Sequence, residues 1–281
     1  MLTKSSMKNL LLSLSFIVLL PVITLSQSFN SLLGDESILY AQTKQVNQFF
    51  RRFNGEEDTR GNRYYKDDLQ YRNAELRRKY LNVLFDYNNS SITDPMRKAF
   101  ITDVLNSKQP VILDFHQGQW FAEVATRFKY KGQEKDLTLF LKLEPETGGY
   151  KWVFTNVYFK AYHEMFSNDT VTGSHFLHPL SHELDFMNLI RVFKDKNYVE
   201  LYTEKSYRPD FLTLFLYEFK KGDLQYVTVK NVKFHFFQVP GWYFELSNFN
   251  RPGTNSGWLI SSLLQLKEDQ KEMVLKYIYH E

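Results

Sequence analysis

The 281-residue chain contains no cysteine. Disulfide bonds, a lipid attached to a thiol and a cysteine nucleophile are therefore excluded, so the fold must be held together by its core. The sequence also lacks a phosphate-binding P-loop, a Gly-rich dinucleotide turn and the G-x-S-x-G motif of serine hydrolases. On these grounds we expect no cofactor.

Surplus charge is also small. The chain has 35 Lys and Arg residues against 32 Asp and Glu residues. Without residues 1–26, which carry two lysines and no acidic residue, the balance is 33 against 32, or +1. A chain so close to neutral has no electrostatic reason to bind nucleic acid or an anionic lipid surface.

The N-terminus has the pattern of a secretory signal. Lys4 and Lys8 precede an apolar run over residues 10–25, and small residues follow. Cleavage is expected after Ser26, and Ala41 offers a second position. We therefore expect an exported protein, periplasmic or extracellular, without membrane contact once the signal is removed. The alternative is an uncleaved membrane anchor.

What the chain has in quantity is aromatic side chains, with 25 Phe, 18 Tyr and 4 Trp. They favour strands and bury large areas, which indicates sheet-rich layers or an aromatic-lined cavity. Residues 128–152 and 234–258 share one order: an aromatic strand, a turn, an apolar strand, a second turn, and a Trp that opens a third strand. This similarity predicts an internal duplication.

Helical periodicity before residue 106, followed by period-two alternation, predicts helices packed on a bent antiparallel sheet. This order, with the motif G-G-Y-K-W-x-F-x-N-V at 148–157, resembles the NTF2-like superfamily, also called the cystatin-like α+β cone. The resemblance implies two tandem NTF2-like modules, each with N-terminal helices on a strongly curved antiparallel sheet. The expected divisions are a signal peptide 1–26, a disordered tail 27–42, a first module 43–160, a linker 161–180, and a second module 181–281 ending in a helix.

In the second half, residues 211–219 and 258–266 are predicted to be apolar strands, and their sheet face leaves room for a homodimer. The apolar positions of the long strand change from odd to even numbers near Lys230 and Asn231. A one-residue β-bulge there would restore a single face and bend the strand. The predicted concave face carries Val232, Phe234, Phe236, Trp242, Phe244 and Leu246.

Three groups of residues are candidates for a functional site. Asp114 and His116 lie two apart on a predicted strand, where a carboxylate could orient an imidazole for general-base work. His175, His178 and His182 have a spacing that could hold a metal, although exposed or capping histidines explain them as well. Candidate binding aromatics, equally expected as core, are Trp120, Phe128, Trp152, Tyr226, Phe234, Phe236, Trp242 and Trp258.

Together these features predict an exported, non-enzymatic binding or assembly protein of the bacterial envelope, with a small molecule or an envelope protein as its partner. One alternative is an isomerase or dehydratase of the NTF2-like kind, which needs a carboxylate or histidine deep in a cone cavity. A second alternative is a membrane-anchored secretion or conjugation subunit, which needs an uncleaved N-terminus.

Overall fold

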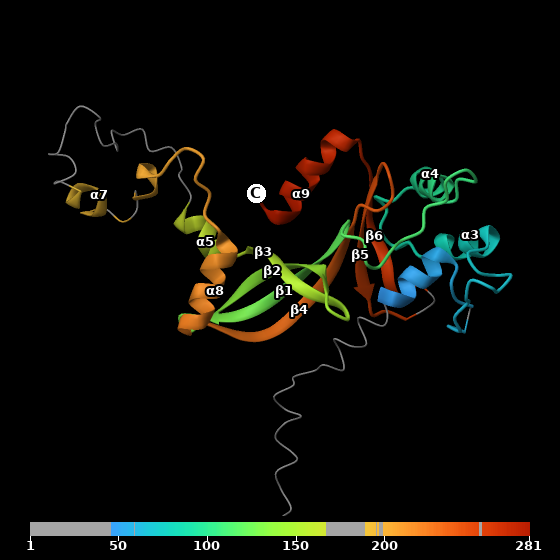
Figure 1. Cartoon of the computed structure of the whole chain (residues 1–281), viewed down its shortest axis with the longest axis horizontal. Helices are drawn as coiled ribbons and strands as arrows, with labels where there is room; N and C mark the ends of the chain where they lie inside the picture. Colours follow the sequence, from blue (N-terminus) through green and yellow to red (C-terminus); the bar gives the residue numbers. More distant parts are fainter. Residues whose placement is uncertain (1–45, 59, 167–188, 195, 197–198, 253–254) are drawn as a thin grey trace, which may run out of the picture. The chain divides into compact units, whose positions relative to one another are not determined.

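Figure 1 shows the computed structural model, which describes residues 46–281 except 59, 167–188, 195, 197–198 and 253–254. The predicted α+β class is confirmed, because six antiparallel strands form one curved sheet against which helices pack. The strands are β1 (Trp120–Tyr130), β2 (Gln133–Glu146), β3 (Gly149–Tyr158), β4 (Leu224–Phe236), β5 (Trp242–Phe249) and β6 (Gly257–Gln265).

The described helices include one over residues 46–54, whose apolar residues recur at helical spacing and are buried. The others are α3 (Ala74–Val83), α4 (Asp94–Val104), α5 (Lys160–Met165), α7 (Ile190–Lys194), α8 (Phe211–Lys221) and α9 (Lys271–Tyr279), with 3-10 turns η1 (Val199–Tyr202) and η2 (Glu268–Gln270). Among the residues that the structure describes, no helix has both the length and the apolar character needed to cross a membrane.

Each half of the chain contributes three consecutive strands, and the two sets join in the order β3-β2-β1-β4-β5-β6. Strand β1 pairs with β4 from Trp120↔Phe236 to Tyr130↔Leu224. The expected pair of tandem modules, each with its own sheet, is therefore not confirmed. The physical reason is that β1 and β4 satisfy each other's backbone groups, so no free sheet edge separates the halves.

The predicted β-bulge is confirmed. Ala125 pairs with Asn231, but the next residue, Thr126, pairs with Val229, so Lys230 is an extra residue on β4. A second shift, which was not predicted, leaves Val227 extra as well. The insertion of Lys230 turns the residues after it back toward the face that packs on the N-terminal helices. As predicted, these side chains share one core cluster, with Val232 partly buried at its margin and Phe234, Phe236, Trp242, Phe244 and Leu246 buried inside it.

The strand predicted over residues 211–219 is wrong, because this segment is the helix α8. The Asp210 side chain accepts hydrogen bonds from the backbone nitrogens of Leu212 and Thr213, which caps the first turn. Gly222 ends the helix with a left-handed φ of 88°. Both capping residues can be read from the sequence. They favour a helix, whereas the apolar run between them was interpreted as a strand.

Segment 258–266, by contrast, contains strand β6 as predicted, with Leu264 exposed at 42%. Trp258, Leu259, Ile260 and Leu263 are buried, the last three at no more than 3% exposure. The C-terminal helix α9 is confirmed, and its Ile278 packs on the sheet face opposite the main core, against Phe121, Phe140, Phe237 and Tyr243. Helices therefore cover both faces of the sheet.

Candidate binding site

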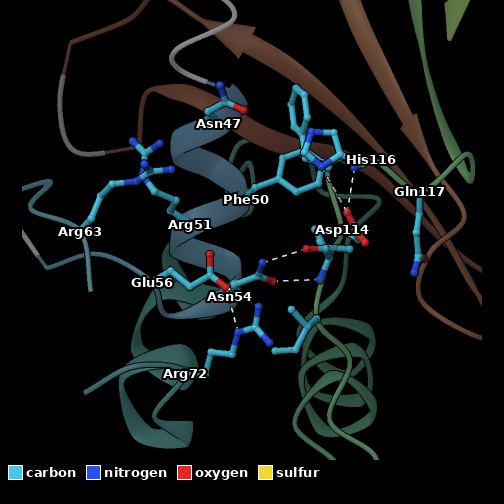
Figure 2. A pocket seen from close by; sticks show the side chains of 13 residues that line it. Asn47, Phe50, Arg51, Asn54, Glu56, Arg63, Arg72, Asp114, His116 and Gln117 are labelled. Carbon is cyan, nitrogen blue, oxygen red and sulfur yellow. Dashed lines mark hydrogen bonds and ion pairs between the residues drawn. The ribbon is translucent and has the colours of Figure 1, made fainter. Parts of the chain in front are cut away.

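A cleft of about 690 Å³ lies between the helix 46–54 and the segment 112–117. Figure 2 shows Arg51, Arg63, Glu56 and Arg72 on one side and Asp114, His116 and Gln117 on the other. The volume is in the range of small-molecule sites. The lining residues are Asn47, Phe50, Arg51, Asn54, Glu56, Arg63, Arg72, Ile112, Leu113, Asp114, Phe115, His116 and Gln117.

The segment 111–115, predicted to be a strand, has no regular structure and is fixed instead by two amide side chains. Asn54 donates to the Leu113 carbonyl at 2.8 Å and accepts from the Leu113 nitrogen at 2.9 Å. Gln238 makes the same pair of bonds with Asp114, at 2.7 and 2.9 Å. These amides satisfy backbone groups that a neighbouring strand would otherwise pair. One wall of the cleft is thereby rigid without belonging to the sheet.

Arg77 holds the other end of this wall. Its side chain is 2% exposed, and it donates to the carbonyls of Phe53 and Val111, directly before two residues of the cleft lining. Burial, together with the charge of Arg72, lowers the pKa of Arg77 to about 10, although Glu56 opposes the shift. Gly55 is required beside it, because a Cβ there would lie 2.7 Å from the Arg77 side chain.

Charged side chains on the opposite wall are only partly paired. The buried Glu57 carboxylate binds Arg51 at 2.8 Å and Arg52 at 2.9 Å, through Nε of each arginine. Arg72 pairs with Glu56 at 2.7 Å. Arg63 is the backbone bridge partner of Glu57, but its guanidinium has no hydrogen bond or ion pair with any described residue. An unpaired cation therefore borders the cleft.

The predicted pair Asp114 and His116 lies on the rim of this cleft. The His116 Nδ1 is 3.9 Å from the Asp114 carboxylate, beyond hydrogen-bond length, and both side chains are half-exposed. The Asp114 carboxylate instead accepts from the His116 backbone nitrogen at 2.8 Å. The His116 ring stacks on Tyr150, with 4.2 Å between ring centroids. In this geometry the carboxylate does not orient the imidazole.

Six of the eight candidate aromatic residues are buried, and none of the eight lines the cleft. Trp242 and Trp258 border two smaller pockets of about 200 and 140 Å³. Phe236 stacks on Trp120 and on Phe244, with centroid distances of 5.2 and 4.7 Å. Trp152 is 36% exposed and Tyr226 is 56% exposed. The remaining candidates are all buried: Trp120, Phe128, Phe234, Phe236, Trp242 and Trp258.

The candidate metal ligands His175, His178 and His182 lie outside the described residues. Within the part of the chain that is described, no three His, Asp or Glu side chains gather in a way that could hold a metal ion. The metal hypothesis therefore stays a prediction from the sequence.

A buried polar chain beneath α9 was not predicted from the sequence. His235 lies 2.8 Å from the Glu123 carboxylate through Nε2 and 2.9 Å from the Tyr243 hydroxyl through Nδ1. Burial opposes ionisation of Glu123, but the hydrogen bond and charge of His235, with Lys233 and His280, lower its pKa overall. Burial, with the charges of Glu245 and Glu123, raises the pKa of Tyr243. None of the three lines the cleft.

The register carries a signal for this chain, since Glu123 and His235 interrupt apolar strands at positions where β1 and β4 pair. This signal can be read only once β1 and β4 are known to pair. The sequence predicted instead that these two strands belong to separate sheets.

Comparisons with known proteins add no relative. No protein-family model matches the chain, and no curated protein or solved structure matches it significantly.

Proposed function

We propose that this is an exported, non-enzymatic binding protein of the bacterial envelope, and that the cleft between the helix 46–54 and segment 112–117 holds a small-molecule ligand. The observation that carries the proposal is the cleft itself, a 690 Å³ space with one wall fixed by side-chain amides and with polar side chains that lack partners among the described residues.

Among the described residues that line the cleft there is no poised acid–base pair, which favours binding over catalysis. Asp114 and His116 are 3.9 Å apart and half-exposed. The buried Glu123–His235 pair lies away from the cleft, under α9, and its groups already bind each other. The isomerase or dehydratase alternative requires such a group inside a cavity, whereas aromatic rings fill the sheet face beneath the N-terminal helices.

The NTF2-like relationship is part of the same proposal. It is supported by the helices that precede a curved antiparallel sheet and by the two similar sets of three strands. We propose two NTF2-like halves that share one sheet. Export rests on the N-terminal sequence alone, and N-terminal sequencing of the mature protein distinguishes cleavage from a retained anchor.

The binding proposal is tested by thermal unfolding of the full chain against a library of metabolites. The Asn47→Trp variant places a large ring in the cleft, and Asn82→Trp makes the same change on an exposed position of α3. We expect at least one compound to raise the melting temperature of the wild type and of Asn82→Trp but not of Asn47→Trp. A compound that stabilises all three proteins equally would place binding elsewhere and contradict the proposal.

A further inference from the structure

The charges and hydrogen-bonding groups of the cleft identify a class of ligand. We propose that the cleft binds an acidic saccharide, a sugar whose carboxylate lies at Arg63 and Arg51 and whose hydroxyl groups face the opposite wall. This inference rests on the proposed binding function and makes it more specific.

The cleft carries an excess of positive charge. Three arginines line the cleft, Arg51, Arg63 and Arg72, against two carboxylates, Glu56 and Asp114. The buried Glu57 carboxylate just behind them is matched by Arg52. One positive charge is left over.

The position of that charge follows from the local pairings. Arg72 is paired with Glu56, and Arg51 uses Nε for Glu57. The terminal nitrogens of Arg51 and the whole guanidinium of Arg63 therefore have no partner among the described residues. Both arginines flank Glu57, one through its side chain and the other through the backbone bridge. Guanidinium groups bind the two oxygens of a carboxylate well, so we assign the ligand carboxylate to these two arginines.

The same cleft also contains hydrogen-bond acceptors. The Glu56 contacts with Tyr71 and Arg72 all use Oε1, and Asp114 uses Oδ1 for the His116 nitrogen. The second oxygen of each carboxylate is thus left without a partner in the described part of the chain. A ligand made only of acceptors, such as sulfate, would be repelled by these oxygens, whereas hydroxyl groups donate to them. The side-chain amides of Asn47 and Gln117, also in the lining, both donate and accept.

Part of the cleft lining is apolar. Phe50 and Phe115 meet edge to face, with 5.2 Å between their ring centroids, and Ile112 also belongs to the lining. An apolar surface of this kind packs against the C–H face of a sugar ring. A carboxylate, several hydroxyl groups and a C–H face occur together in uronic acids and in their oligomers.

The test is titration calorimetry of the full chain with glucuronate and galacturonate. Glucose and galactose serve as probes without the charge, and benzoate as a probe with the charge but without hydroxyl groups. We expect the uronates to bind at least about tenfold more tightly than the neutral sugars and than benzoate, because loss of a charged hydrogen bond costs this much or more.

Two variants locate the charge. Arg63→Gln removes the unpaired cation and is expected to weaken uronate binding about tenfold or more, while affinity for neutral sugars stays unchanged. Arg60→Gln makes the same charge change three residues away, outside the lining, and is expected to leave uronate affinity within about twofold. Equal effects of the two variants would show that only the general field acts, and would overturn the inference.

The outcomes separate the two proposals. Equal binding of neutral sugars, or of benzoate, overturns the acidic saccharide while leaving a binding cleft. The acidic saccharide is also overturned, and the binding cleft kept, if no probe binds but another library compound stabilises the wild type and not Asn47→Trp. Failure of all probes and of the whole library contradicts both.

Discussion

Replacing Phe236 by alanine tests whether the aromatic residues of the sheet are core or ligand-contacting. The Phe236 ring is fully buried and stacked between Trp120 and Phe244, nearly parallel to both, at interplanar angles of 9° and 2°. Truncation loses the transfer free energy of the ring, leaves a cavity among its neighbours, and removes four aromatic contacts, with Phe49, Phe50, Trp120 and Phe244. We expect a loss of about 3–5 kcal/mol in the free energy of unfolding.

Urea unfolding followed by tryptophan fluorescence measures this loss, since Trp120 packs directly on the ring. In a domain of this size the melting temperature should fall by roughly 6–20 °C. Tyr226→Ala on the same strand is the matched control, because its side chain is 56% exposed, and its expected cost is below about 1 kcal/mol. If Phe236→Ala costs no more than the control, the side chain lines a space rather than filling one, and the assignment to the core fails.

Two further predictions concern backbone conformation and pH. Gly222→Ala should cost about 1 kcal/mol in urea unfolding, because φ is 88° and nothing lies near the added Cβ, so the strain is purely conformational; a neutral result would contradict the left-handed cap. Burial opposes ionisation of Glu123, but its His235 contact lowers the pKa overall, so its contribution is present above the unfolded value of 4.5 and is lost as pH falls through the lower folded pKa. Glu123→Gln should therefore lower the urea midpoint at pH 6 and have less effect as the pH decreases; a constant difference would refute this.

Much of the sheet follows from local sequence. Six strands were predicted at the right places because period-two alternation and turn residues are local signals. The extra residue Lys230 was also predictable, since the apolar positions change parity around it. The pairing of β1 with β4 was not, because a period-two pattern says which face of a strand is buried but not which strand lies beside it.

The error at residues 211–219 has a different cause. Its apolar run fits either a strand or a helix, and only the caps at Asp210 and Gly222 distinguish them. The structure also explains why Glu218 of this helix is buried. Its carboxylate accepts hydrogen bonds from the hydroxyl groups of Tyr130 and Tyr162 at 3.1 and 3.0 Å. Those partners are 88 and 56 residues away, so no local pattern reveals them.

Only some of the residues that line the cleft were singled out from the sequence. Asp114 and His116 were singled out for an interaction that the structure does not contain, yet both lie on its rim. The arginines of the other wall fall in a polar loop and its surroundings, where sequence gives composition without geometry. Their placement depends on the buried Glu57, which forms ion pairs with Arg51 and Arg52 and a backbone bridge with Arg63.

The failure to predict the segment 111–115 correctly is connected to the site. A strand there would have placed its backbone in the sheet and its alternate side chains in the core. Asn54 and Gln238 instead supply the backbone partners from the side, at Leu113 and Asp114. The two amides bind four backbone groups of Leu113 and Asp114, and the neighbouring residues 115–117 belong to the lining of the cleft. The amide clamps thus provide rigidity at the wall without the pairing that would have closed it.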